Sequence, residues 1–130
     1  MWNTPTEEDL AKIPRLYKTE HIPLREKLIQ LHFFFGDSDW YIVEYDGGDI
    51  FWGFAILGGD LMNAEWGYIP FSELKSLNIG GFLVDRDLYW EVQPAGQVYK
   101  IRQAWCHSHW EDSLPNSALA CGGEIGSEKA

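Results

Sequence analysis

Positive charge is missing from the middle of this 130-residue chain, because no lysine or arginine occurs between Lys27 and Lys75. The same interval holds eight carboxylates, which supply −8 of the formal net charge of −10. Proteins that bind nucleic acids directly place lysine and arginine on the phosphates. The charge balance therefore argues against a nucleic-acid ligand and favours a basic protein partner.

Cysteines and long apolar runs are also scarce. Two cysteines, Cys106 and Cys121, are too few for a disulfide framework, although one bridge between them stays open. No apolar run approaches the ~20 residues of a membrane-spanning helix. Residues 1–9 have neither the basic nor the apolar part of a secretory signal. These absences predict a cytoplasmic protein without membrane contact.

Aromatic and apolar residues, by contrast, are plentiful. Aromatic residues make up 15% and hydrophobic residues 45% of the chain, which is enough for a packed core. Apolar runs separated by turn signals predict five strands, at residues 28–35, 40–45, 50–57, 65–69 and 88–92. Their close spacing predicts an α+β fold, an antiparallel β-meander of about five strands with short helices packed on it.

Helix signals flank the strands. Thr6, followed by three acidic residues, is typical of a helix N-terminus. Pro70 begins a second short helix, in which Leu74 and Leu77 form one apolar stripe. Residues 98–105 fit either a strand or a helix. We expect a single α+β domain at residues 1–96 and a C-terminal extension at 97–130, partly ordered and then mobile.

Several short motifs resemble, in their order and spacing, a bacterial family filed as domain of unknown function 2958. The resemblance covers roughly residues 13–94. It rests on Leu16-Tyr17 with Thr19-Glu20, Asp37-Ser38 with Trp40-Tyr41, Glu44-Tyr45-Asp46, Phe51 with Gly53, Glu65-Trp66-Gly67-Tyr68 with Ser72-Glu73-Leu74, and Asp85-Arg86-Asp87-Leu88 with Trp90. The resemblance implies a small cytoplasmic protein of a kind often encoded on mobile elements, and it implies no catalytic residues.

The acidic, aromatic-rich middle of the chain is the candidate binding surface. An unpaired buried carboxylate costs several kcal/mol, so we expect most of these acids at the surface. There they would attract a basic partner, with exposed tryptophans as anchors. The predicted acidic binding residues are Asp37, Asp39, Glu44, Asp46, Asp49 and Glu65, and the predicted aromatic anchors are Trp40 and Trp52.

These observations predict a binding protein without catalytic activity. Carboxylates spaced along turns can imitate phosphates, so a basic protein that handles nucleic acids is a suitable target. Combined with the mobile-element context that the resemblance implies, the hypothesis becomes an inhibitor of a host defence protein. The sequence does not decide the oligomeric state.

The alternative hypothesis is a small hydrolase or a metal-dependent enzyme that uses His32, Glu44 or the segment from Cys106. His32 lies between apolar residues, which is more typical of a hydrogen-bonded side chain than of a catalytic base. The weak metal candidates are Cys106, His107, His109 and Cys121, residue types that suit zinc at a spacing that fits no standard zinc template. We therefore expect no metal and no other cofactor.

Overall fold

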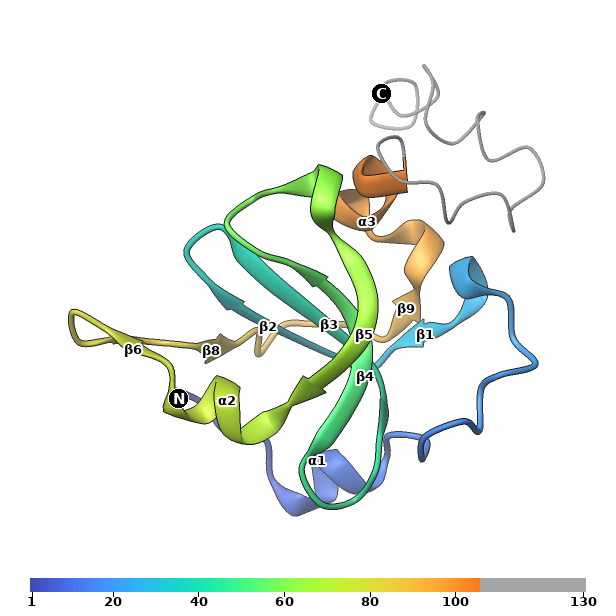
Figure 1. The fold of residues 1–130 in the computed structure, drawn as a ribbon. Helices are drawn as coiled ribbons and strands as arrows, with labels where there is room; N and C mark the ends of the chain where they lie inside the picture. Colours follow the sequence, from blue (N-terminus) through green and yellow to red (C-terminus); the bar gives the residue numbers. More distant parts are fainter. Residues whose placement is uncertain (106–130) are drawn as a thin grey trace.

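A computed structural model gives the structure of the chain and describes residues 1–105 (Figure 1). It confirms an α+β fold built on a five-stranded antiparallel sheet in the order β5-β4-β3-β2-β8. The strands of this sheet are β2 (Leu31–Phe35), β3 (Ser38–Tyr45), β4 (Ile50–Ile56), β5 (Glu65–Pro70) and β8 (Asp85–Arg86). The sheet is a meander from β2 to β5, as the turn signals predict.

Short elements surround this sheet. The helices are α1 (Glu7–Ala11), α2 (Phe71–Ser76) and α3 (Tyr99–Trp105), with single 3₁₀ turns η1 (Leu24–Glu26), η2 (Leu61–Asn63) and η3 (Ala95–Gln97). Two pairs of two-residue strands complete the described part: β1 (Leu28–Ile29) with β9 (Gln93–Pro94), and β6 (Asn78–Ile79) with β7 (Phe82–Leu83).

The predicted starts of α1 and α2 are confirmed. The Thr6 hydroxyl accepts from the Asp9 backbone, and the Asp9 carboxylate accepts from the Thr6 backbone, which is a capping box. Helix α2 begins directly after Pro70, and Leu74 is buried against the sheet with Leu77 packed beside it.

Two strand predictions are wrong in detail. Residues 88–92 form no strand; instead Asp87 begins a turn, because its carboxylate accepts from the Tyr89 N–H and its carbonyl from the Trp90 N–H. The fifth strand is β8, just before that turn. The predicted strand 28–35 is two strands, since β1 turns away from the main sheet to pair with β9.

A β-bulge decides which face several side chains of β3 occupy. The pairing of β3 with β4 shifts between Ile42 and Glu44, so that Glu44 lies opposite Trp52 and Tyr45 opposite Phe51. Strict alternation would place Glu44 on the other face. At the bulge a Cβ on Gly53 would overlap the Tyr41 carbonyl, so this close approach of two backbones requires glycine.

Core side chains cover both faces of the sheet. One cluster joins Tyr41, Val43, Phe54 and Ile56 to residues of η3 and α3, including Ala95, Ile101 and Trp105. The other joins Phe33, Trp40, Ile42 and Phe51 to Phe71 and Leu74 of α2. Of residues 98–105, which fit either a strand or a helix, Tyr99–Trp105 form α3 and supply core side chains. The predicted mobile end lies outside the described residues.

Candidate functional site

Glu44 is a buried structural residue, and the expectation that it faces solvent is wrong. Its side chain is 5% exposed. One carboxylate oxygen accepts from the Tyr17 N–H at 2.9 Å, and the other accepts from the N–H (3.0 Å) and the hydroxyl of Thr19. Tyr17 has a positive φ of 71°, which a bulky residue rarely adopts. Glu44 therefore holds the segment before β1 in a strained conformation.

Lys27 lies beside this carboxylate and is also buried. Its ammonium donates to the carbonyl and the hydroxyl of Thr19 and lies over the ring of Trp52. Burial lowers the pKa of Lys27, and the nearby carboxylates of Glu44 and Glu20 oppose that effect. Lys27 thus supplies a positive charge within the fold near Glu44, one of the acids of the interval that lacks lysine and arginine.

These residues border a cavity of about 270 Å³ that we call the tyrosine pocket. At its rim the hydroxyls of Tyr17 and Tyr68 are 2.8 Å apart, while both rings are largely exposed. The pocket is lined by Tyr17, Glu20, Leu24, Lys27, Glu44, Trp52 and Tyr68. Most of its polar groups already have partners, so it offers aromatic surface more than free charge.

Asp39 is the second predicted binding residue that the fold buries, at 3% exposure. One carboxylate oxygen is 2.7 Å from Nε2 of His32 and the other is 2.8 Å from Nζ of Lys100 on α3. Burial alone would raise the pKa of Asp39, but the hydrogen bonds from His32 and Lys100 lower it below its ordinary value. Asp39 therefore links α3 to the sheet through its ion pair with Lys100.

His32 matches the interpretation of a hydrogen-bonded side chain at a sheet face. Its second ring nitrogen is 3.2 Å from the Asp87 carboxylate, and its ring stacks on Tyr41 at 4.6 Å. His32 lines neither the tyrosine pocket nor the groove described below. Within residues 1–105, no three of the His, Cys, Asp and Glu side chains are placed to hold a metal ion. The candidates Cys106, His107, His109 and Cys121 lie outside the described residues.

Asp46 and Asp49, in the β3–β4 turn, are occupied by local hydrogen bonds. One oxygen of Asp46 accepts from the N–H groups of Gly48, Asp49 and Ile50, and these bonds with nearby Arg15 hold its pKa low. Asp49 accepts from the N–H and hydroxyl of Ser72 on α2, both at 2.8 Å. These two acids fix the turn and the start of α2.

The two predicted tryptophan anchors are not exposed. Trp40 is 7% exposed and belongs to the core against α2. Trp52 is half-buried, stacked on Trp66 with ring centroids 5.0 Å apart. On the side of β5, exposed aromatic rings are instead supplied by Tyr17 and Tyr68.

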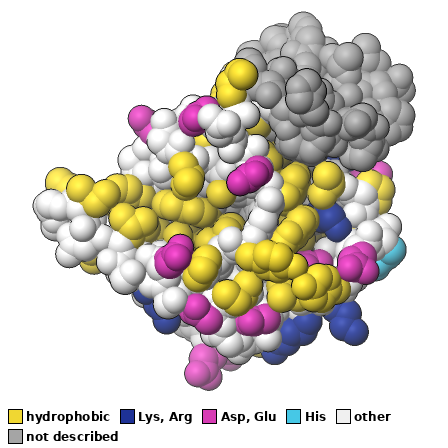
Figure 2. Space-filling model, in the orientation of Figure 1, with side chains coloured by type: hydrophobic (Ala, Val, Ile, Leu, Met, Phe, Trp, Pro, Cys, Tyr) yellow, Lys and Arg dark blue, Asp and Glu magenta, His cyan; other side chains and the backbone are white. Residues whose placement is uncertain are grey.

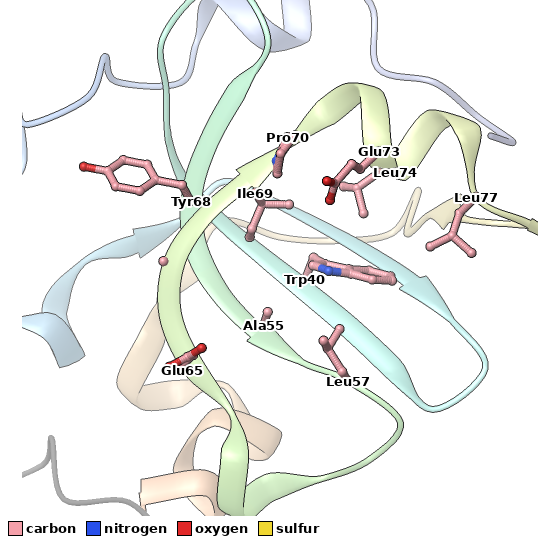
Figure 3. A pocket seen from close by; sticks show the side chains of 11 residues that line it. Trp40, Ala55, Leu57, Glu65, Tyr68, Ile69, Pro70, Glu73, Leu74 and Leu77 are labelled. Carbon is pink, nitrogen blue, oxygen red and sulfur yellow. The ribbon is translucent and has the colours of Figure 1, made fainter.

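Glu65 remains as a surface acid, and it borders an apolar groove of about 360 Å³ between the β4–β5 face and α2 (Figure 3). We call this the β5 groove. Its apolar wall consists of Trp40, Ala55, Leu57, Ile69, Leu74 and Leu77, and its charged side chains are Glu65 and Glu73. The side chain of Tyr68 points away from it (Figure 3). Glu65 and Glu44 thus lie on opposite faces, because of the bulge in β3.

The surface around β5 combines apolar and acidic side chains. Figure 2 shows hydrophobic side chains gathered on this face with separate acidic ones among them, while basic side chains lie toward the lower and right parts of the view. Leu57 and Tyr68 are more than half exposed.

Sequence reasoning missed the groove residues Glu73, Leu57 and Leu77 as a site. A signal existed for β5, since Glu65, Gly67 and Ile69 alternate with Trp66 and Tyr68 and must share a face. No local pattern shows that α2 folds back to form the other wall. No helix within residues 1–105 is long and apolar enough to cross a membrane.

A comparison with protein families, curated proteins and solved structures finds no match for this chain. The resemblance to domain of unknown function 2958 stays a prediction. In the fold, several of its motif residues meet around the tyrosine pocket: Tyr17, Glu20, Glu44 and Tyr68.

Proposed function

We propose that this protein is a non-catalytic binding protein that engages a basic partner protein through the β5 groove. The observation that carries the proposal is the chemistry of that groove, which has an apolar wall and carboxylates as its only charged side chains, Glu65 and Glu73. Lysine and arginine place an apolar stem on such a wall and a cationic head at its rim. The groove therefore fits basic side chains better than acidic or small polar ones.

The net charge of the chain supports the same partner. A charge of −10 attracts a basic protein over a distance and speeds its association, an effect that salt screens. Some of these acids are buried and bound by other residues of the fold, so fewer acids are available to a partner than the sequence suggests. Of the eight acids between Lys27 and Lys75, five are exposed (Asp37, Asp46, Asp60, Glu65 and Glu73), Asp49 is half-buried, and Asp39 and Glu44 are buried. The binding acids in this proposal are Glu65 and Glu73, joined by Asp37 as a source of attraction.

The class of partner follows from the resemblance and the charge together. We propose a host protein that handles nucleic acids, such as a restriction or CRISPR effector, whose basic surface the acidic protein covers in the cytoplasm. This part of the proposal depends on the mobile-element context that the resemblance implies.

The test compares two doubly substituted variants with equal net charge in a capture from bacterial lysate. The groove variant is Glu65→Lys with Glu73→Lys. The matched control is Glu26→Lys with Glu91→Lys, which changes two exposed acids outside the groove. Parent and control are expected to retain the same basic protein, and the groove variant is expected to lose it.

A second measurement follows the association rate of the captured protein at low salt and at ~0.5 M salt, where the screening length falls from ~10 Å to a few Å. We expect a rate that falls at least tenfold. Equal retention by the groove variant, or a rate that salt leaves unchanged, would contradict the proposal.

A further inference from the structure

We infer that the tyrosine pocket is a recognition site for one arginine side chain of a polypeptide. The guanidinium lies against the rings of Tyr17 and Tyr68 and pairs with the carboxylate of Glu20. This site goes beyond the proposed function, because it is a different recess with different side chains. The Tyr68 ring points away from the β5 groove (Figure 3), so a ligand can fill one recess and leave the other empty.

Hydrogen bonds hold the pocket in shape without a ligand. Tyr17 and Glu20 lie on one turn, in which the Glu20 N–H donates to the Tyr17 carbonyl. The buried carboxylate of Glu44 accepts from the N–H groups of Tyr17 and Thr19, and so fixes this turn from inside. The hydroxyls of Tyr17 and Tyr68, 2.8 Å apart, then join the turn to β5. Because the two rings are already positioned, a ligand does not have to order them.

The two tyrosine rings are the aromatic surfaces of the pocket that a cation can reach. Trp52 also lines the pocket, but it is half-buried, stacks on Trp66 and has the Lys27 ammonium 5.6 Å from its ring centroid. Tyr17 and Tyr68, by contrast, are 59% and 56% exposed. Cations bind to the faces of aromatic rings, and guanidinium stacks on them better than ammonium does, because it is planar and weakly hydrated. The rings therefore favour arginine over lysine.

The charges around the pocket favour a cation over an anion. Two carboxylates and one ammonium line it, those of Glu20, Glu44 and Lys27, which gives a net charge of −1. Glu44 and Lys27 are buried, and both are hydrogen-bonded to Thr19. Glu20 is exposed, and its carboxylate forms no hydrogen bond or salt bridge within residues 1–105. This carboxylate is therefore available to a guanidinium, which it can bind through two parallel hydrogen bonds.

The pocket fits a side chain of a polypeptide better than a free small molecule. Its volume of about 270 Å³ is below the ~300–1,000 Å³ of sites for drug-sized ligands. Free arginine would also bring an α-carboxylate, which Lys27 cannot receive because its ammonium is buried against Thr19. The carboxylate of Glu20 would repel that group. An arginine within a peptide or protein carries no such negative charge.

The experiment titrates the isotope-labelled full-length protein with the peptide acetyl-Gly-Arg-Gly-amide at low salt and follows the backbone amide signals by NMR. Three other ligands are compared with it. They are the same peptide with citrulline, which keeps the planar shape without the charge, the same peptide with lysine, and free L-arginine. We expect the signals of Tyr17, Glu20 and Tyr68 to titrate with the arginine peptide, and each of the other ligands to bind at least threefold more weakly.

Two matched pairs of variants locate the site. Glu20→Gln and Tyr17→Ala are expected to weaken binding of the arginine peptide at least threefold. Glu26→Gln and Tyr89→Ala change an exposed acid and an exposed tyrosine outside the pocket, and they should leave the affinity unchanged. Equal effects within either pair would overturn the inference.

Other outcomes separate the pocket from the β5 groove. A citrulline or lysine peptide that binds as tightly as the arginine peptide overturns the inference, because charge or planarity then plays no part. Free arginine that binds as tightly as the peptide, or pocket signals that do not move at millimolar peptide, overturns it as well. The variant Glu65→Gln with Glu73→Gln neutralises the groove and should still bind the peptide in the pocket. If it loses binding while Glu20→Gln retains it, the arginine binds in the groove, which overturns this inference and leaves the proposed function standing.

Discussion

Replacing Glu44 tests whether this acid serves the fold or a partner. Its carboxylate accepts three hydrogen bonds, two of them from Thr19, which is itself buried. The substitution Glu44→Ala leaves these donors without an acceptor and removes a carboxylate whose charge acts on the buried Lys27 ammonium. Leaving a buried donor unsatisfied costs about 1–3 kcal/mol.

Two buried donors from Thr19 therefore give a loss of about 2–6 kcal/mol. We expect the free energy of unfolding to fall by about 4 kcal/mol, a large part of the ~5–15 kcal/mol typical of a domain.

The assay is equilibrium urea unfolding of the parent, Glu44→Ala, Glu44→Gln and the control Glu65→Gln. With a slope of about 2 kcal/mol per molar urea, the alanine variant should unfold roughly 2 M earlier. Glu44→Gln retains one acceptor oxygen and should fall between the parent and Glu44→Ala. Because Glu65 is exposed, its substitution should stay within ~0.5 kcal/mol of the parent. If Glu44→Ala is no more destabilising than Glu65→Gln, the assignment of Glu44 to the fold is refuted.

Three further predictions use the same unfolding assay. Gly53→Ala should lower the free energy of unfolding by about 3 kcal/mol or prevent folding, because the added Cβ overlaps the Tyr41 backbone. Gly67→Ala, at the position opposite Gly53 on β5, should change the stability little, and equal effects of the two substitutions would contradict this. Asp39→Asn should lose less stability than the parent as the pH falls below about 4. The lowered pKa of Asp39 stabilises the fold at pH values above its unfolded pKa of ~3.9, and this contribution disappears as the pH falls through the folded pKa. Parallel curves of stability against pH for parent and variant would refute this. Thr6→Ala should cost about 1 kcal/mol through the lost helix cap, and an unchanged urea midpoint would count against the capping box.

The sequence alone determined the parts of the fold that depend on neighbouring residues. Alternating apolar residues specify strands because side chains alternate across a sheet, and the Asp46-Gly47-Gly48-Asp49 turn specifies a hairpin because Gly47 adopts a positive φ. The Thr6 cap and the helix after Pro70 are local for the same reason. The antiparallel α+β fold could therefore be predicted, and so could the hydrogen-bonded state of His32.

Only the tertiary structure decided which charges remain available. Lys100 pairs with Asp39 across 61 residues, and Thr19 donates to Glu44 across 25 residues, so residues outside the interval from Lys27 to Lys75 supply a counter-charge to one of its acids and hydrogen bonds to another. Hydrogen bonds over such separations leave no periodic signal in the chain.

The groove depended on tertiary structure for a further reason. A one-residue bulge beside Gly53 turned Glu44 to the face opposite Glu65, and α2 supplied Glu73, Leu74 and Leu77 to a wall that β5 could not form alone. A bulge moves every later side chain of its strand to the other face, and whether it forms depends on the backbone of the partner strand.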